Sequence, residues 1–187
     1  MFQGYPARTS TAVVDITVTD RNDEPPVFTQ HFHTHIAENA PIGMFVMKIT
    51  STDADIGENA VHTYAFTNNP GDKFSIDSAS GEITVVGELD FEQQDEYILR
   101  VSANDQAYNV ETTVSVYIDD VNDNRPVFEQ TSYRFDVLEQ QPITSLVGVV
   151  SAVDADSDGP NSQVYYVFKT SNHWFHLDTE SGTITNR

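Results

Sequence analysis

Acidic and amide side chains recur in two short tracts of nearly the same sequence. The first reads Asp-Arg-Asn-Asp-Glu-Pro-Pro-Val-Phe over residues 20–28, and the second reads Asp-Val-Asn-Asp-Asn-Arg-Pro-Val-Phe over residues 120–128, 100 positions later. Carboxylate and carbonyl oxygens are the ligands that hard divalent cations prefer. The tracts therefore predict cation sites, and their spacing predicts that each site lies where two repeated units meet.

Further oxygen ligands follow each tract. Asp-Ala-Asp, then glycine and asparagine, occupies residues 53–59 and returns at residues 154–161, where Asp158 adds one residue to the loop. Each unit also places a glutamate at the end of its first expected strand, Glu38 and Glu139. Two carboxylates about 4 Å apart repel each other by roughly 4 kcal/mol at an effective dielectric of 20, and a bound cation reverses the sign of this effect. Such a cluster therefore predicts a counterion, and Ca²⁺ suits its ligands.

The composition favours cations over polyanions as partners. Twenty-nine acidic residues face nine lysines and arginines, which gives a formal net charge of −20 and a pI near 4.2. This charge repels nucleic acid and anionic lipid. The chain is 39% hydrophobic and 11% aromatic, which is enough to build packed cores rather than a disordered chain. Cysteine is absent, so disulfides and thiolate metal sites are excluded.

The sequence contains no stretch of about 18 apolar residues, and residues 1–20 lack the apolar core of a signal peptide. If the chain is extracellular, we expect it to be a fragment of a longer protein. Any membrane attachment then depends on other parts of that protein.

Alternating apolar and polar residues between Gly, Pro, Asn and Asp turns predict an all-β chain. Seven strands are expected within about 95 residues of the middle unit, which is typical of an antiparallel sandwich. The expected strands are 32–38, 45–52, 61–67, 74–77, 82–86, 97–103 and 112–119.

The third unit repeats this order and stops early. Residues 133–137 match 32–36, and residues 175–184 match 74–83, but no counterparts of the last two strands follow. We predict that this unit cannot fold stably alone. Residues 11–19 match the final strand of the middle unit, so we expect them to be the tail of a preceding unit. The predicted division is 1–24, the end of a preceding repeat with its linker; 25–124, a complete repeat with its linker; and 125–187, a truncated repeat.

The middle unit adds two more motifs, Leu-Asp-Phe-Glu at residues 89–92 and Val-Ser-Ala-Asn-Asp at residues 101–105. These five kinds of motif in this order, at a period near 100, resemble cadherin extracellular repeats. The resemblance covers residues 11–187. It implies tandem seven-strand Greek-key sandwiches of immunoglobulin-like form, one complete and two partial. It also implies three Ca²⁺ ions at each junction, bound by residues from both neighbouring repeats.

The resemblance implies a ligand set for each junction. At the junction between the middle and third units, the upstream unit and linker are expected to supply Glu38, Asp90, Glu92, Asp120, Asp123 and the Val121 carbonyl. The downstream side is expected to supply Asn122, Asp154, Asp156 and the carbonyls of Asn124 and Asn161. At the junction near the start of the chain, the expected ligands are Asp20, Asn22, Asp23, Asp53, Asp55, Asp105 and the carbonyls of Arg21, Glu24 and Asn59.

Two departures from the family's usual pattern affect these expectations. Glu24 stands where the family usually has Asn, but because that position supplies a main-chain oxygen we expect binding to survive. Phe91 stands where Arg is common, and we expect its side chain to point away from the metal.

Other interpretations of the same residues are weaker. Residues 154–159 imitate half of an EF-hand loop, but position twelve is Tyr165 instead of the required Glu. Alternation would place Asp90 and Glu92 on one strand face, as a pair of glycosidase carboxylates, but no aromatic subsite accompanies them. A Ser-His-Asp arrangement lacks a nucleophile-elbow glycine pattern. Residues 31–35 carry three alternating histidines, for which a solvated strand face is favoured over a zinc site.

The sequence therefore predicts a non-enzymatic protein of calcium-dependent adhesion or recognition. We expect a calcium-stiffened segment of a longer protein at the extracellular face of the plasma membrane, with other cadherin ectodomains as homophilic or heterophilic partners. Two alternatives remain open: a secreted or bacterial module that binds carbohydrate or matrix, and a passive, force-bearing spacer.

Overall fold

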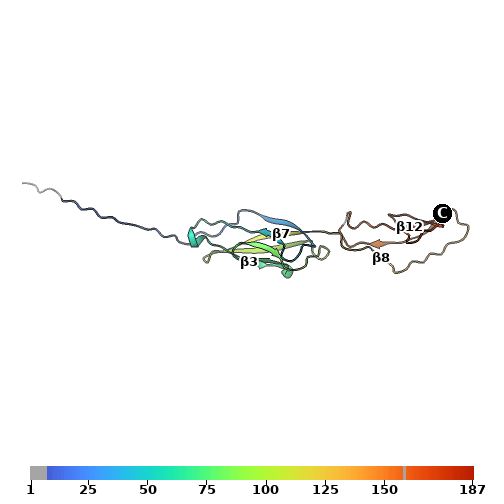
Figure 1. Ribbon diagram of the computed structural model, residues 1–187, viewed down its shortest axis with the longest axis horizontal. Coiled ribbons are helices and arrows are strands. Elements are labelled where there is room, and N and C mark those ends of the chain that lie inside the picture. The colour runs from blue at the N-terminus through green and yellow to red at the C-terminus, as the bar shows by residue number, and fades with distance from the viewer. Residues whose placement is uncertain (1–7, 158) are drawn as a thin grey trace, which may run out of the picture.

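The computed structural model describes residues 8–157 and 159–187 as sheets joined by loops, with two short 3₁₀ turns, Gly57–Ala60 and Pro70–Asp72. Figure 1 shows an extended N-terminal segment, then the middle unit, then the third unit, arranged along one axis. No helix among the described residues is long and apolar enough to cross a membrane.

The middle unit contains all seven expected strands, with ends displaced by at most four residues. They are β1 (Phe32–Ala37), β2 (Phe45–Lys48), β3 (Thr63–Asn68), β4 (Phe74–Ile76), β5 (Glu82–Val85), β6 (Glu96–Asn104) and β7 (Asn109–Asp119). One sheet has the order β1-β7-β6-β3 and the other has the order β2-β5-β4. The all-β sandwich predicted from the alternation is confirmed.

Alternation along the strands fills the core between the two sheets. On β6, Tyr97, Leu99 and Val101 are buried, and on β7, Val114 and Val116 are buried. Each fully buried side chain of this kind contributes about 1.5–3 kcal/mol relative to an exposed one. The two central strands therefore supply much of the apolar core between the sheets, and this core holds both ends of the sandwich in place.

The third unit forms a counterpart of only one sheet of the middle unit, together with a short two-stranded pair. Its strands are β8 (Val127–Phe128), β9 (Leu146–Val149), β10 (Ala152–Val153), β11 (Phe175–Leu177) and β12 (Thr183–Asn186). The order β9-β12-β11 reproduces β2-β5-β4, while β8 pairs with β10.

A first strand at residues 133–137, expected from the match to β1, is not formed. The reason is pairing, because β1 is held by parallel hydrogen bonds to β7 and β3 is held by β6. Residues 125–187 contain no counterpart of β6 or β7. Apolar side chains consequently stay open to solvent, with Val167 79% exposed, and a hollow of about 450 Å³ lies among Tyr133, Tyr166 and Ile184.

Residues 8–19 also lie outside every strand. The apolar side chains of this segment are mostly exposed, including Val13 and Val18 at 90% each. Within the part of the chain that the structure describes, nothing covers this alternating sequence. Its assignment as the last strand of a preceding unit remains a prediction.

Candidate metal centre

Three segments of the middle unit converge at its downstream end. Glu38 follows β1, the linker 120–124 follows β7, and residues 89–92 lie between β5 and β6. The loop after β10 brings Asp154 and Asp156 to the same place from the third unit. We call this region the second junction. Because strand ends define it, the sandwich itself brings acidic residues 85 positions apart, Glu38 and Asp123, into proximity.

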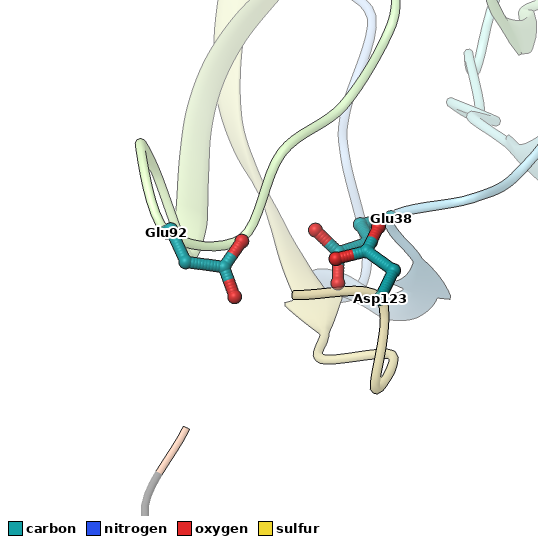
Figure 2. Close-up of side chains that lie close together, drawn as sticks. All are labelled: Glu38, Glu92 and Asp123. Carbon is teal, nitrogen blue, oxygen red and sulfur yellow. The ribbon is translucent and has the colours of Figure 1, made fainter. Parts of the chain in front are cut away.

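Two groups of carboxylates meet at the second junction. Oxygens of Glu38, Glu92 and Asp123 lie within 4.8 Å of one another, and so do oxygens of Glu92, Asp120 and Asp156. Figure 2 shows the carboxylates of Glu38 and Asp123 close together, with that of Glu92 facing them from the turn. Glu92 belongs to both groups, and Asp156 comes from the third unit. The acidic residues of the two units therefore form one continuous cluster.

Hydrogen bonds hold Glu38 in place at the centre of this cluster. Its side chain is buried, and the N–H of Phe91 donates to Oε2 at 2.7 Å while the N–H of Val121 donates to Oε1 at 2.7 Å. One carboxylate thus ties β1 to the turn and to the linker. The Phe91 ring packs against the apolar core, which confirms that it points away from the acidic cluster.

Asp90 and Glu92 do not share a strand face, so that expectation is wrong. Both lie in a turn, in which the N–H of Gln94 donates to the carbonyl of Asp90 at 3.0 Å. Gln93 donates to both carboxylate oxygens of Asp90, from its N–H at 2.9 Å and from Nε2. The turn, rather than strand alternation, therefore sets their separation.

The linker of the second junction is bound to the loop of the third unit. Asp120 Oδ2 accepts hydrogen bonds from Ser157 Oγ at 2.7 Å and Asn161 Nδ2 at 2.6 Å. Asp156 Oδ1 accepts from the N–H and the Nδ2 of Asn124, at 3.1 and 2.8 Å. These bonds use one oxygen of each carboxylate and leave the other available.

Asn161 and Asp154 also lie at the second junction. The carbonyl of Asn161 accepts a hydrogen bond from Asn122 Nδ2 at 3.1 Å, and Asp154 Oδ1 accepts one from the N–H of Asp156 at 3.2 Å. The inserted Asp158 lies outside the described residues. The extra residue nevertheless leaves Asn161 beside the linker.

The same arrangement recurs around residues 20–24, which we call the first junction. Asp55 Oδ2 accepts from the N–H groups of Asp23 and Glu24, each at 3.2 Å. Asp20 Oδ2 accepts from the N–H of Ile56 at 3.1 Å and from Asn59 Nδ2 at 3.0 Å. The linker therefore contacts the Asp-Ala-Asp loop in both junctions through equivalent positions.

Asp105 completes the first junction from the end of β6. It is 1% exposed, and its Oδ1 accepts from the N–H groups of Ala107 at 2.8 Å and Tyr108 at 2.6 Å. Its carbonyl accepts from Asn22 Nδ2 at 2.9 Å. These contacts fix Asn22 and Asp105 next to each other.

Buried oxygens without hydrogen bonds concentrate at the two junctions. Among the described residues, five buried side-chain polar atoms have no hydrogen-bond partner, and four of them belong to predicted metal ligands. Those four are Asn22 Oδ1, Asp105 Oδ2, Asp120 Oδ1 and Asp156 Oδ2. Because a buried oxygen without a partner is costly, such atoms call for a hydrogen-bond donor or a cation. The donor set fits Ca²⁺, which binds carboxylate and amide oxygens.

The protonation equilibria of the second junction reflect this crowding. Loss of solvation, and then the charges of Glu38, Asp120 and Asp123, raises the pKa of Glu92. Loss of solvation and neighbouring carboxylates also raise the pKa of Asp123. Hydrogen bonds from Ser157 and then Asn161 lower the pKa of Asp120. At Glu92 and Asp123 the raised pKa therefore helps a proton to compete with a cation.

The histidines at residues 31–35 lie apart from these groups. His33 and His35 are exposed on β1, and His35 Nδ1 lies 3.0 Å from Asp119 Oδ1. Among the described residues, the groups close enough to share a metal ion are the two acidic ones of the second junction. Ser157 is a contributor that the sequence analysis missed, because a hydroxyl in a loop gives no signal of which carboxylate it will contact.

Comparison with known proteins agrees with this fold. The model of the cadherin domain matches residues 32–119 and 133–187. The chain therefore belongs to the cadherin domain family, whose members are not enzymes. The acidic clusters lie at the junction between its two matched regions.

Individual relatives share the sequence over nearly the whole chain. Human Protocadherin Fat 4 is 37% identical over 185 residues, which is 99% of this chain and 4% of that protein. Chimpanzee Protocadherin-11 X-linked is 39% identical over 185 residues, which is 97% of this chain and 14% of that protein. The chain thus spans a small part of the length of these relatives.

Solved structures agree with the arrangement of the units. The crystal structure of mouse Cadherin-23 EC22-24 matches with a TM-score of 0.79 and 33% identity, over 90% of this chain and 55% of that one. The structure of mouse clustered PcdhgC3 EC1-3 matches with a TM-score of 0.81 and 27% identity, over 91% of this chain and 58% of that one.

Proposed function

We propose that the chain binds Ca²⁺ at both junctions and that the ions hold successive cadherin repeats in line for cell adhesion or recognition. The observation that carries this proposal is the set of four buried, unpartnered oxygens, all on predicted ligands. Bound Ca²⁺ supplies positive charge to carboxylates that otherwise repel one another. The residues of this chain orient their oxygens, and the ion links the units that contribute them.

The proposed ligand set is the one implied by the family resemblance. At the second junction the two acidic groups support it directly, since they draw on Glu38, Glu92 and Asp123 and on Asp120 and Asp156. At the first junction, Asp55 supports it through a linker contact equivalent to that of Asp156, and Asn22 and Asp105 support it through their contact with each other. We infer the main-chain carbonyl ligands from the positions of these side chains. The repeat boundaries at residues 24 and 124 form part of the same proposal.

Family membership supports a place for this chain at the extracellular face of the plasma membrane, with other cadherin ectodomains as partners. Sites in extracellular modules have dissociation constants of about 10⁻⁴ to 10⁻³ M. Extracellular calcium at about 1 mM occupies about half to nine tenths of such sites, and cytosolic calcium leaves them nearly empty. The proposed sites are therefore suited to stiffening the repeats outside the cell.

Isothermal titration calorimetry of the whole chain tests the proposal. We expect calcium-dependent heat with affinities in the range of extracellular modules, and we expect it to weaken when Asp120 is replaced by Ala. Glu111→Gln is the matched control, because it removes one exposed carboxylate on β7 that belongs neither to the two acidic groups nor to the proposed ligand set. Equal heats for the wild-type chain and Asp120→Ala would reject the assignment of the second junction.

A further inference from the structure

A buried hydrogen-bond series leads from the sandwich to the first junction. Ser51 Oγ lies 2.6 Å from His62 Nδ1, and His62 Nε2 lies 3.0 Å from Asp53 Oδ2. The side chains of His62 and Asp53 are 7% and 1% exposed. Asp53 is the first residue of the Asp-Ala-Asp motif, so the series ends on a proposed calcium ligand.

The direction of each hydrogen bond follows from the chemistry of the groups. The Asp53 carboxylate only accepts, so Nε2–H of His62 donates to it. When the ring carries this one proton, Nδ1 accepts from the Ser51 hydroxyl. Tyr64 O–H then donates to Ser51 Oγ at 3.0 Å, and the Tyr64 oxygen accepts from the N–H of Ser51 at 3.1 Å. Every member of the series therefore has a partner, which fixes both the tautomer and the orientation of the imidazole.

This series contains the residue types of a Ser-His-Asp triad, but its geometry serves a different purpose. The Ser51 hydroxyl is directed between His62 and Tyr64, and the two rings meet edge to face at 6.5 Å and 89°. The histidine is enclosed instead of facing a substrate cleft. Its remaining role is to hold the carboxylate at the end of the series.

Both oxygens of Asp53 are consequently oriented before any ion binds. Oδ1 accepts from the N–H of Asp55 at 2.9 Å, and Oδ2 accepts from His62. A carboxylate with a fixed orientation loses less side-chain freedom when it binds a cation, and groups that hydrogen-bond to metal ligands tune metal affinity.

The third unit provides an internal comparison, because its equivalent loop lacks this series. Tyr166 O–H lies 2.8 Å from the N–H of Ala152, just as Tyr64 contacts Ser51, which fixes the alignment of the two units. At the positions of Ser51 and His62 the third unit carries Ala152 and Val164, whose side chains cannot form hydrogen bonds. The loop fold therefore does not require the series, and the middle unit has it in addition.

We propose that His62, oriented by Ser51, is a positioning residue that holds Asp53 for calcium binding and raises the calcium affinity of the first junction. This inference rests on the proposed function, since it concerns a ligand of the same site. It distinguishes the two junctions of this chain: one has a histidine behind its Asp-Ala-Asp motif, and the other has a valine.

Nuclear magnetic resonance of the whole chain tests this inference, because one calcium titration reports both junctions separately. The side-chain amide of Asn22 reports the first junction, and that of Asn122 reports the second. His62→Val copies the third unit, and we expect it to weaken calcium binding at the first junction by about 10- to 100-fold. Binding at the second junction stays within about twofold of the wild-type value on the same reasoning.

Two further variants separate positioning from a general structural effect. His62→Gln keeps an N–H donor near the place of Nε2, so we expect it to recover part of the lost affinity. Ser51→Ala leaves the histidine but frees its ring, and we expect a smaller loss than for His62→Val. His33→Val is the matched control, because it makes the same substitution at an exposed position on β1. We expect no change in affinity from it.

A readout in EDTA does not depend on metal. Histidine ¹H–¹⁵N spectra should show the proton of His62 on Nε2 in the wild-type chain and a loss of that single tautomer in Ser51→Ala. The inference is overturned if His62→Val leaves the first junction unchanged, if it weakens both junctions equally, or if His62→Gln binds no better than His62→Val. A wild-type chain that binds no calcium at either junction overturns the proposed function, and with it this inference.

Discussion

Asp105→Asn should change stability only when calcium is present. Asp105 is 1% exposed, its Oδ1 accepts two backbone N–H groups, and its Oδ2 has no partner among the described residues. Asparagine has the same shape and keeps an oxygen for the two N–H groups. It replaces the unpartnered oxygen with an amide NH₂, which cannot bind a cation.

The size of the effect follows from mass action. At about 10 mM calcium, a site with a dissociation constant of about 10⁻⁴ to 10⁻³ M contributes about 1.4 to 2.7 kcal/mol to the stability of the folded state. For a unit of this size, each kcal/mol corresponds to about 4 to 8 °C in melting temperature, so one site is worth roughly 6 to 20 °C. We expect the variant to lose most of this increment.

Thermal melts in EDTA and in calcium measure the two halves of the prediction. In EDTA, Asp105→Asn should melt no lower than the wild-type chain, because the atom that it changes has no bond to lose. In calcium, it should melt well below the wild-type chain, while the control Glu111→Gln follows the wild-type chain in both buffers. A variant that is destabilised equally in EDTA and in calcium would refute the reasoning, since Oδ2 would then have a structural partner.

Three further outcomes are expected. Leu99→Ala removes a fully buried side chain from β6 and should lower the free energy of unfolding by about 2 to 5 kcal/mol. Urea titrations should show equal losses with and without calcium. A loss seen only in calcium would contradict the separation of core from junction. Asp123→Ala removes a carboxylate from the second junction, so calorimetry should show weaker calcium binding. The small-angle scattering of this variant in calcium should resemble that in EDTA. An unaltered calcium isotherm would count against the assignment. The folded-state pKa values of Glu92 and Asp123 are raised, so without metal the folded chain binds protons more tightly than the unfolded chain. Its stability should therefore fall as the pH rises from the ordinary carboxyl range through the raised values. Glu92→Gln should reduce this slope in EDTA melts, and a stability that rises over this window would show the sign to be wrong.

The strands of the middle unit could be predicted because alternation directly reports burial. Tyr97, Leu99 and Val101 alternate with exposed residues, and all three are buried on β6. Pairing between distant strands gives no such local signal. Residues 133–137 have an alternating pattern similar to that of β1, yet they form no strand, since a β1-type strand depends on a partner equivalent to β7.

The acidic positions could be predicted from motif spacing, but their supporting contacts could not. Repetition of Asp-Ala-Asp pointed to Asp53, and the linker tract pointed to Asp120. The partners that orient these carboxylates, His62 and Ser157, come from side chains whose directions depend on the folded loop. The turn that sets the separation of Asp90 and Glu92 could not be predicted from alternation, because an alternating charge pattern also occurs in turns.

A crystal structure of the chain grown in millimolar calcium tests the central claim most directly. We predict anomalous density at both junctions, about 2.3 to 2.6 Å from the unpartnered oxygens of Asn22, Asp105, Asp120 and Asp156. The account would be contradicted if those oxygens were instead hydrogen-bonded to water or protein donors, with no anomalous density beside them.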